Sequence, residues 1–393
     1  MKHYTYIIVG AGVAADMAIK GIRRIDKQSE IALFGKEPHP PYDRPPLSKE
    51  LWKGKNEEII WRALNTHQLQ EYYGREIISI DPVEKTITDQ LGEHYQYDAL
   101  LLATGGSPRK LPFGDGLIHY LHDLEAYLRI KEVVAHAEHI GVIGGGFIGS
   151  EMASVLNEHG KRVSMFFPED GIGANVFPSE LSQLITETYI EKGVEVFTGE
   201  NVIDVQANGE GCVLITDTDR EIEVDVVIAG IGLLPNIALA KSSGINTNRG
   251  IVVDEQLHTN YAEIFAAGDA AEFTQPLLQK QLHVEHEDNA RAMGKQAGRN
   301  MAGANEPFEH LSYFYSDMFD MSYVAMGEVS SKLATYIDWR EPFKKAVVYY
   351  LDEGRVRGVL FWNVSNAVQE AKVLIADPGP FTEKELKNKI VVD

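Results

Sequence analysis

Two glycine-rich turns of the same kind stand far apart in this chain, and each follows an apolar run. The turns are Gly10-x-Gly12-x-x-Ala15 and Gly144-x-Gly146-x-x-Gly149. In such a turn the first Gly permits a sharp bend from strand to helix, the second lets backbone approach a phosphate, and the third small residue lets helix and strand pack. The free N–H groups at the helix start then attract a pyrophosphate. Two such turns predict two bound dinucleotides, between which electrons can pass.

An acidic residue follows each turn where a ribose hydroxyl is expected. Glu37 ends the apolar run after the first turn and Glu169 ends the run after the second, each near the usual spacing of about 20 residues. A carboxylate there accepts a hydrogen bond from a ribose 2′-hydroxyl. At the second turn Glu169 and Asp170 would repel a 2′-phosphate, and no Arg follows within several residues. The pattern therefore predicts NADH rather than NADPH at the second turn.

The segments around the turns have the patterns that must position them. Apolar strand runs at 6–9 and 31–34 enclose a helical pattern at 14–24. The second copy repeats the order, with strands at 140–143 and 162–167 around a helix at 148–159. A strand before and a helix after each turn are the context that such a motif requires. Two matches, each in context and each with its acid, argue against coincidence.

The order of these patterns predicts three domains. We expect a discontinuous first domain of residues 1–112 and 244–311, because the segment with Gly268 and Asp269 returns to the first βαβ unit. Residues 113–243 are expected to form the second domain around the second turn. Residues 312–393 show alternating, aromatic-rich runs followed by a helical pattern. This pattern predicts a C-terminal α+β domain with an antiparallel sheet.

Composition and charge exclude several classes of protein. The 393 residues are 44% hydrophobic and carry a net charge of −21, which disfavours binding to nucleic acid or to an anionic membrane surface. No apolar run approaches the ~20 residues of a membrane span. The first strand begins near Tyr4, which leaves no room for a signal peptide, so a cytoplasmic location is expected. Cys212 is the single cysteine, which excludes an internal disulfide and a CxxC redox pair. No metal site is predicted.

Seven segments resemble the flavoprotein family that unites the apoptosis-inducing factors with the NADH-dependent ferredoxin and rubredoxin reductases. They are PYDRPPLSKELW (41–52), LLATGGSPR (101–109), GGGFIGSE (144–151), AGIGLLPN (229–236), AAGDAA (266–271), HVEHEDNA (283–290) and GVLFWN (358–363). The resemblance covers nearly the whole chain. It implies FAD at the first turn and NAD(H) at the second. It also implies a glutathione-reductase-like α/β fold, with two Rossmann-like dinucleotide-binding domains plus the α+β C-terminal domain.

The resemblance implies catalytic roles for four residues. Lys49 is implied to lie beside the flavin ring and to pair with Glu151, since a cation there stabilises the anionic reduced ring. Phe147 is implied to cover the flavin and to yield to the nicotinamide. His286 is implied to lie near the flavin as a possible proton donor. Plainer alternatives stay open: Lys49 and Glu151 as surface charges, Phe147 as a helix-packing residue, and His286 as a core histidine.

A wider set is implied to bind the two cofactors. The residues are Gly10, Gly12, Ala15, Glu37, Arg44, Lys49, Thr104, Gly105, Arg109, Gly268, Asp269, Glu285 and His286, and around the second turn Gly144, Gly146, Phe147, Ile148, Gly149, Glu151, Glu169 and Gly232. Asp269 is implied to hold the ribityl chain of FAD.

Three departures from the family pattern qualify these roles. Lys36 stands at one of two adjacent positions where relatives carry acids, which leaves Glu37 as the ribose candidate. Tyr315 stands where the family usually has Trp. The stretch 332–345 is short and lacks the long insertion of animal apoptosis-inducing factors, so a role in cell death is not carried over.

The expected function is that of an FAD-containing NADH-dependent oxidoreductase. Hydride passes from NADH to FAD, and electrons continue to a ferredoxin or rubredoxin, a quinone or oxygen. The alternative is a slow reductase of the apoptosis-inducing-factor type, a redox-responsive interaction protein whose dimerisation changes with NADH, so a homodimer is possible. A disulfide reductase is disfavoured because Cys212 stands alone. Iron–sulfur acceptors are often acidic, so a chain at −21 would need a local basic patch to bind one.

Overall fold

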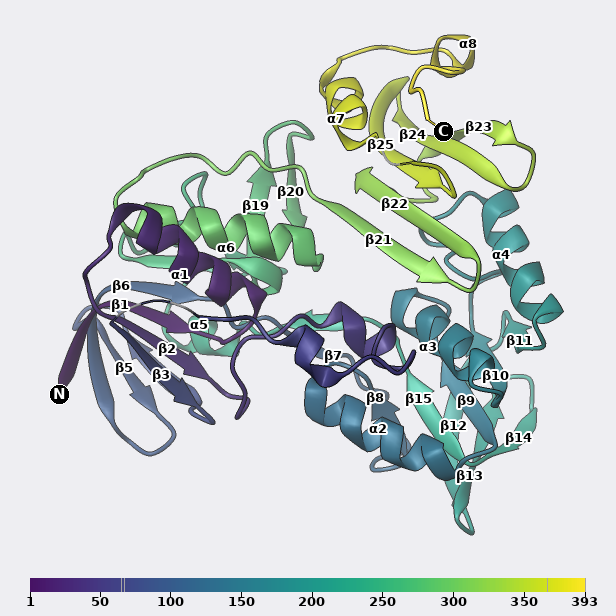
Figure 1. Ribbon diagram of the computed structural model, residues 1–393, viewed down its shortest axis with the longest axis horizontal. Coiled ribbons are helices and arrows are strands. Elements are labelled where there is room, and N and C mark those ends of the chain that lie inside the picture. Colours follow the sequence, from purple (N-terminus) through teal and green to yellow (C-terminus); the bar gives the residue numbers. More distant parts are fainter. Residues whose placement is uncertain (65, 67, 366, 393) are drawn as a thin grey trace. The chain divides into compact units, whose positions relative to one another are not determined.

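The computed structural model describes residues 1–64, 66, 68–365 and 367–392, and the chain forms two compact units (Figure 1). Unit 1 contains Met1–Asp43, Glu58–Ser107 and Leu234–Phe314, and unit 2 contains Arg44–Glu57, Pro108–Leu233 and Tyr315–Asp393. Unit 2 therefore joins most of the second and third expected domains, and the division into three domains stays a prediction. The short strands β7 (Gly106–Pro108) and β16 (Leu233–Pro235) each contain a point where the chain passes between units.

Unit 1 is built on a mostly parallel sheet in the order β3-β2-β1-β6-β5-β4. Its strands are β1 (Lys2–Val9), β2 (Ile31–Gly35), β3 (Leu69–Tyr73), β4 (Ile77–Asp81), β5 (Thr86–Asp89) and β6 (His94–Leu102). A further strand, β18 (Ile264–Ala266), pairs in parallel with β6, so the segment before Gly268 does return to the first sheet. The central strands are apolar runs because both faces of the sheet are buried.

Two helices of unit 1 pack against each other through glycines. Helix α1 (Val13–Ile25) contacts α6 (Glu287–Met301). A Cβ on Gly298 would lie 2.0 Å from the carbonyl oxygen of Ala18, and one on Gly294 would lie 2.2 Å from that of Ala14. A Cβ on Gly21 would likewise lie 2.2 Å from the carbonyl oxygen of Lys295. The two backbones are therefore closer than any larger residue permits at these positions.

The remaining elements of unit 1 are short. They are the 3-10 turns η2 (Glu57–Ile60, with Glu57 in unit 2) and η3 (Gly268–Ala270), helix α5 (Ala238–Ser242), and the strands β17 (Ile251–Val252), β19 (Ala271–Gln275) and β20 (Lys280–His283). The last three form a small sheet in the order β17-β19-β20. This sheet connects the η3 turn to the start of α6.

Unit 2 contains a second parallel sheet, in the order β11-β10-β9-β15-β8. Its strands are β8 (Ile118–Tyr120), β9 (His139–Ile143), β10 (Arg162–Phe167), β11 (Glu195–Thr198) and β15 (Val226–Ala229), and its helices are α2 (Leu124–His136), α3 (Phe147–Glu158) and α4 (Ser179–Glu191). The antiparallel strands β12 (Val202–Asn208), β13 (Gly211–Thr216) and β14 (Glu221–Val224) form a separate sheet. A 3-10 turn, η1 (Pro45–Ser48), precedes Lys49.

The C-terminal part of unit 2 is the predicted antiparallel sheet. Its order is β21-β22-β25-β24-β23. The strands are β21 (Tyr313–Met318, whose first two residues belong to unit 1), β22 (Met321–Gly327), β23 (Ala334–Glu341), β24 (Lys345–Asp352) and β25 (Arg355–Trp362), and the helices α7 (Val368–Ala376) and α8 (Glu383–Leu386) follow. Two Rossmann-like parallel sheets and one antiparallel sheet confirm the expected fold class. Among the described residues, no helix combines the length and the apolar character needed to cross a bilayer.

The glycine contact between α1 and α6 yields a test of the fold. Replacing Gly298 by Ala gains helix propensity but forces the two backbones apart, so we expect a net loss of about 1–3 kcal/mol in the free energy of unfolding. Thermal denaturation of the flavin-loaded protein measures it. Lys295→Ala, on the exposed face of the same helix, is the control and should stay within about 0.5 kcal/mol. Equal stability of the Gly298 variant and the parent would show that the helices do not need this contact.

Candidate functional site

The first glycine turn joins β1 to α1 and leaves one side of its backbone open. Gly10 has a φ of +109°, which glycine adopts without strain, and a Cβ there would lie 2.0 Å from the carbonyl oxygen of Ala103. At Gly12, in contrast, no heavy atom lies within 4 Å of the Cβ position. Gly12 is also the N-cap of α1 and supplies no side-chain cap. A ligand can therefore approach the first backbone N–H groups of α1 from the side of Gly12.

The second turn, between β9 and α3, repeats this geometry. Gly144 has a φ of +114°, and its Cβ would lie 2.4 Å from the carbonyl oxygen of Gly230. A Cβ on Gly149 would lie 2.0 Å from the carbonyl oxygen of Gly144, whereas the Cβ position of Gly146 has open space. Gly146 caps α3 without a side chain. Both turns therefore fit a pyrophosphate, which needs free N–H donors and a backbone it can approach.

Both predicted ribose acids follow the second strand of their βαβ unit. Glu37 follows β2, and its carboxylate accepts a hydrogen bond of 2.5 Å from the hydroxyl of Tyr42. Lys36 is exposed and pairs with Glu76 at 2.8 Å, so it does not compete for the position of Glu37. Glu169 follows β10, and its carboxylate accepts from the amide of Asn175 at 2.9 Å. Sequence analysis missed Tyr42 and Asn175, which orient the two acids.

The segments with Thr104 and Asp269 lie in unit 1 with the first turn. The Thr104 hydroxyl donates to the carbonyl oxygen of Asn236 at 2.7 Å, and the Asn236 amide donates to the Thr104 carbonyl oxygen at 2.9 Å. Gly105 next to it has a φ of +62°. Gly268 has a φ of +75°, and its Cβ position is 3.1 Å from the Cβ of Ala14 in the first turn of α1. The structure therefore brings the η3 turn and the start of α1 together.

The two predicted cofactor arginines belong to unit 2. Arg44 is the N-cap of η1, and its guanidinium donates to the carbonyl oxygen of His122. Arg109 is exposed, and its backbone N–H donates to the carbonyl oxygen of Gly232 at 2.9 Å. Arg44 is thus already engaged with the backbone of unit 2. The roles of both arginines toward FAD stay predictions.

Lys49 and Glu151 form a buried ion pair in unit 2. Lys49 is 8% exposed and Glu151 is 6% exposed, and their Nζ and Oε1 atoms are 3.1 Å apart. The hydroxyl of Ser48 donates to the other carboxylate oxygen at 2.6 Å, and the hydroxyl of Ser316 donates to Oε1. The Lys49 ammonium also lies 4.6 Å from the ring centroid of Tyr315. The alternative of two surface charges is therefore wrong.

Phe147 is the first residue of α3 and is partly exposed. Its ring centroid lies 6.5 Å from that of Tyr323. Tyr323 is 2% exposed, and burial raises the pKa of its hydroxyl well above the ordinary value. Phe177 packs edge-on against Tyr323 at 5.1 Å. Phe147 therefore lies at the edge of an aromatic cluster rather than inside it, and its role over the flavin stays a prediction.

His286 is the N-cap of α6, and its ring stacks on Phe314 with the centroids 4.3 Å apart. Burial lowers its pKa to about 4, an effect that the nearby Asp288 carboxylate only partly opposes. The imidazole is therefore neutral near pH 7, and an imidazolium is not available there as a proton donor. Glu285 beside it is exposed and lies 3.6 Å from the ring of His283. The catalytic role of His286 stays a prediction.

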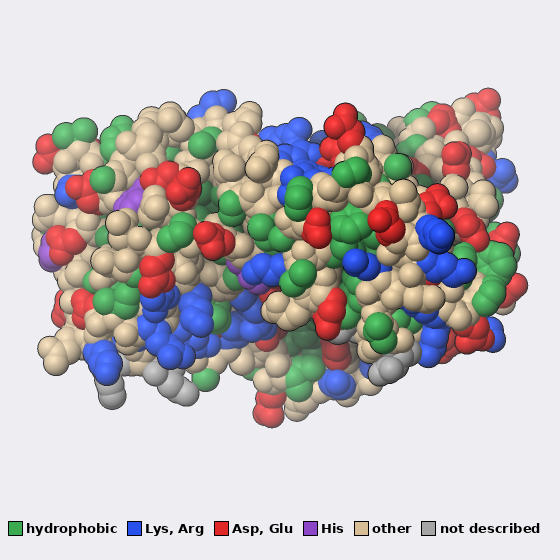
Figure 2. Space-filling view, turned by 90° about the horizontal axis from the view of Figure 1, so that it is seen from above, with side chains coloured by type: hydrophobic (Ala, Val, Ile, Leu, Met, Phe, Trp, Pro, Cys, Tyr) green, Lys and Arg blue, Asp and Glu red, His purple; other side chains and the backbone are tan. Residues whose placement is uncertain are grey.

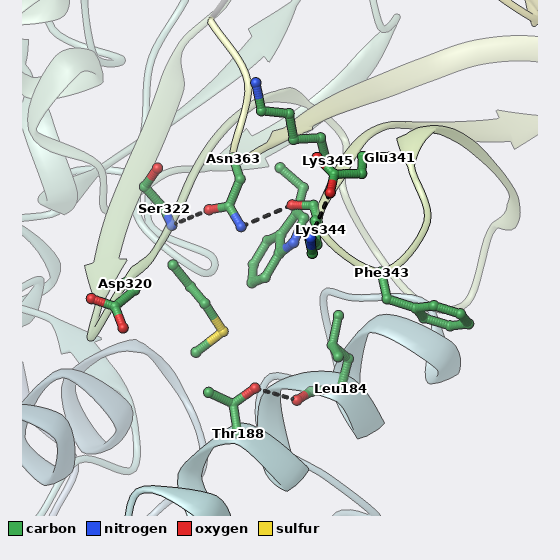
Figure 3. Close-up of a pocket in the computed structure, with 11 residues that line it drawn as sticks. Leu184, Thr188, Asp320, Ser322, Glu341, Phe343, Lys344, Lys345 and Asn363 are labelled. Atoms are coloured by element: carbon green, nitrogen blue, oxygen red, sulfur yellow. Dashed lines mark hydrogen bonds and ion pairs between the residues drawn. The ribbon is translucent and has the colours of Figure 1, made fainter.

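A hollow of about 510 Å³ in unit 2 lies apart from the predicted residues (Figure 3). It has walls from α4, β22 and the turn between β23 and β24, and no predicted site residue is among the residues that line it. Several of its polar groups are already engaged: the Asn363 side chain accepts from the Ser322 N–H at 2.7 Å, and Lys344 pairs with Glu341 at 2.6 Å. Within the described residues, no cluster of His, Cys, Asp and Glu side chains is arranged to hold a metal ion.

Two glycine turns that fit a pyrophosphate, each followed by a carboxylate that a neighbouring side chain holds, and a buried Lys–Glu pair are the features expected of a pyridine-nucleotide-dependent flavoprotein oxidoreductase. The model of the pyridine nucleotide-disulphide oxidoreductase family matches residues 4–294, and the chain belongs to this family. FAD and NAD(H) are the cofactors of its members, so the cofactor prediction is confirmed. Cys212 is the one cysteine and is buried, and burial raises the pKa of its thiol. The disulfide chemistry in the family's name is therefore not available from this chain's own thiols.

Proteins similar to this chain include members of both branches of the expected group. An apoptosis-inducing factor 1 of Dictyostelium discoideum is 33% identical, over 95% of this chain and 79% of its own length. The ferredoxin–NAD(+) reductase component of the 3-phenylpropionate/cinnamic acid dioxygenase of Photorhabdus laumondii is 29% identical, over 96% and 98%. The structure of a covalent putidaredoxin reductase–putidaredoxin complex aligns with a TM-score of 0.87 and 25% identity, over 98% of each chain. These likenesses confirm the family resemblance.

The open side of the second turn yields a paired test. Gly146→Ala adds a methyl group in empty space at an ordinary φ of −84°, so folding should be unchanged while the methyl group obstructs the pyrophosphate. We expect the dissociation constant for NADH to rise about tenfold or more, which is about 1.4 kcal/mol. Fluorescence titration measures the constant, and thermal denaturation checks the fold. Gly149→Ala is the contrasting variant and should lose stability. Unchanged NADH binding by the Gly146 variant would contradict the assignment of this turn.

Proposed function

We propose that this chain is an FAD-containing, NADH-dependent oxidoreductase whose electrons pass to a small iron–sulfur protein. The observation that carries the proposal is the buried pair of Lys49 and Glu151, at 3.1 Å, on the same unit as a turn fitted to a dinucleotide. When bound, FAD supplies the chemistry that converts a hydride into electrons for an acceptor. The protein's own residues bind and orient the two cofactors and stabilise the charge that develops during hydride transfer.

The second turn is proposed to hold NADH. The N–H groups at the start of α3 bind the pyrophosphate, and the open face at Gly146 lets it approach. Glu169 accepts a hydrogen bond from the ribose 2′-hydroxyl, and the Asn175 amide, which donates to one oxygen of the carboxylate, holds it in place. A 2′-phosphate in that place would face the charge of Glu169. NADH is therefore favoured over NADPH.

Lys49 is proposed to supply a fixed positive charge for hydride transfer. A preorganised cation in a site that excludes water stabilises developing negative charge far more than it would in water. Glu151 holds the ammonium in place, and Ser48 and Ser316 hold Glu151. This arrangement limits the positions that the ammonium can take. It also explains why a charged pair is kept in a buried place.

The acceptor is proposed from the relatives and from the cysteine content. One relative is named a ferredoxin–NAD(+) reductase component, and one similar structure is titled a complex with putidaredoxin. Exit through a dithiol is excluded because Cys212 is the single cysteine of the chain. Quinones and oxygen are the other acceptors to compare. A cytoplasmic location and a homodimer stay predictions.

The second candidate function is a slow reductase of the apoptosis-inducing-factor type. The 33% identity to such a factor favours it. In that function NADH reduces the protein slowly and the reduced complex persists, so that a change of oligomeric state becomes the output. Anaerobic stopped-flow with NADH, followed by mixing with a ferredoxin, separates the two functions. Fast reduction and fast reoxidation support the first; slow reduction, a lasting long-wavelength band and a shift in oligomer size support the second.

Removing the Lys49 charge should slow reduction of the flavin by NADH about 10²-fold, since a preorganised electrostatic group is worth roughly that factor. Lys49→Met also leaves Glu151 buried without its partner, which costs about 3–5 kcal/mol of stability. The double variant Lys49→Met/Glu151→Gln removes both charges, so it should regain stability while staying slow. Stopped-flow rates on flavin-loaded protein measure the effect. A double variant as fast as the parent would remove Lys49 from the mechanism.

Removing the Glu169 carboxylate should relax the preference for NADH. Glu169→Ala loses a hydrogen bond to a charged group. We therefore expect the free-energy preference for NADH over NADPH, given by the ratio of their kcat/KM values, to fall by about 1–3 kcal/mol. Asn175→Ala keeps the carboxylate and only frees its position, so it is the matched control with a smaller effect. A parent protein that uses NADPH as efficiently as NADH would contradict the role given to Glu169.

A further inference from the structure

The loop that carries the acid of the second turn has no helix or strand of its own. We call residues 168–178 the Glu169 loop, and it joins β10 to α4 in unit 2. Binding residues often lie on loops that a rigid scaffold positions. The conformation of this loop must therefore come from contacts with the elements around it.

Two neighbouring backbone carbonyl groups of the Glu169 loop accept hydrogen bonds from the C-terminal antiparallel sheet. The hydroxyl of Tyr350, on β24, donates to the carbonyl oxygen of Val176 at 3.0 Å. The backbone N–H of Ser331, between β22 and β23, donates to the carbonyl oxygen of Asn175 at 3.2 Å. The side chain of the same Asn175 donates to the Glu169 carboxylate at 2.9 Å. The sheet is thus connected to the acid through Asn175 and the residue that follows it.

An aromatic ring of the Glu169 loop also packs against the sheet. Phe177 is buried and lies edge-on to Tyr323 of β22, with the ring centroids 5.1 Å apart. Its centroid is 6.1 Å from that of Trp362 on β25. Both separations lie in the range at which edge-on ring pairs attract each other. The strands β22, β24 and β25 therefore all contact the loop at Val176 or Phe177.

The middle of the loop is held by the glycine turn and by α4. The backbone N–H of Gly173 donates to the carbonyl oxygen of Gly145, inside the second turn, at 2.9 Å. The backbone N–H of Ile172 donates to the hydroxyl of Thr186 on α4, also at 2.9 Å. Asn175 therefore lies between two anchors, one on the Rossmann-like side of the unit and one on the antiparallel sheet.

Tyr350 is the contact that a single substitution removes with the least other change. The side chain is buried, and Phe in its place keeps the ring and deletes only the hydroxyl. Its neighbour Tyr349 is buried too, but successive side chains of a strand face opposite sides of a sheet. The Tyr349 hydroxyl accepts from the backbone N–H of Ile390 at 3.4 Å. One of these tyrosines thus contacts the Glu169 loop and the other the C-terminal tail.

We propose that the C-terminal antiparallel sheet is a specificity element of the NADH site, with Tyr350 as a positioning residue for Glu169. The inference rests on the proposed function, which assigns NADH to the second turn. Tyr350 fixes the backbone beside Asn175, and Asn175 keeps the carboxylate where the ribose 2′-hydroxyl donates. When the loop is loosened, NADH loses this hydrogen bond, whereas a nucleotide with a 2′-phosphate loses only a repulsion.

The test uses ADP-ribose, the part of NADH that carries this ribose and cannot reduce the flavin. Calorimetric titration of the flavin-loaded, oxidised protein measures its dissociation constant. In Tyr350→Phe we expect the constant to rise about three- to tenfold, the range that one hydrogen bond supplies. The constant for 2′-phospho-ADP-ribose should stay the same or fall. Tyr349→Phe removes a buried hydroxyl from the same strand, so it is the matched control and should leave both constants unchanged.

Both substitutions keep the charge of the protein as it is. Acidic and basic side chains are spread over the surface (Figure 2), and their net charge of −21 acts on any anionic ligand. Because neither Tyr→Phe change alters this field, a difference between the two variants reports on position. In turnover with ferricyanide as acceptor, the KM for NADH should rise by a larger factor than kcat falls, because the loop positions the ribose and not the reacting ring.

A double-mutant cycle shows whether Tyr350 acts through Glu169. In the Glu169→Ala background, Tyr350→Phe should no longer weaken the binding of ADP-ribose. The proposal is overturned by an equal effect in both backgrounds, which would mean a general loosening of the fold, or by an unchanged constant in Tyr350→Phe alone. A parent that binds no ADP-ribose refutes the proposed function and this inference together. Binding that depends on Tyr350 in a protein that reduces no acceptor would support the inference and refute only the proposed function.

Discussion

The close approach of backbone to backbone at the two glycine turns is the constraint on which the rest depends. In each turn a strand must end, reverse and start a helix within van der Waals contact of a neighbouring strand. The Gly10 backbone lies against the carbonyl oxygen of Ala103, just after β6, and the Gly144 backbone lies against that of Gly230, just after β15. At either glycine a Cβ atom would be too close to this oxygen. Because these contacts fix where α1 and α3 begin, they also fix where the free N–H groups point. A side chain at Gly10 or Gly144 would displace the helix start and the phosphate site together.

Much of this was predictable because the signals are local. The sequence patterns predicted helices at 14–24 and 148–159, and the structure has Val13–Ile25 and Phe147–Glu158. The turns, the strands before them and the acids after them all lie within one βαβ unit, so spacing along the chain translates directly into position. The family resemblance added the pairing of Lys49 with Glu151, which are distant in sequence and which periodicity alone does not connect.

What sequence reasoning missed consists of contacts between distant segments. The Ser316 hydroxyl donates a hydrogen bond to Glu151, which is 165 positions away in the chain. The Asn236 amide donates to the carbonyl oxygen of Thr104, which is 132 positions away. A serine or an asparagine at such a position looks like any other in the sequence. The contact between α1 and α6 is of the same kind. It depends on Gly21, Gly294 and Gly298, which let the two helices touch, and no local pattern in the sequence pairs these positions.

The energetics of the Lys49–Glu151 pair argue for a chemical role rather than a structural one. Taking both charges out of water costs several kcal/mol per ion, and well-packed apolar residues in place of such a pair often leave a protein equally or more stable. Here the cost is reduced by two hydroxyl donors to Glu151 and by the ring of Tyr315 near the ammonium. Three further groups thus serve one ion pair. A fold that needed only stability has a simpler solution at this place, whereas a fold that must hold one cation in a fixed position beside a reaction does not.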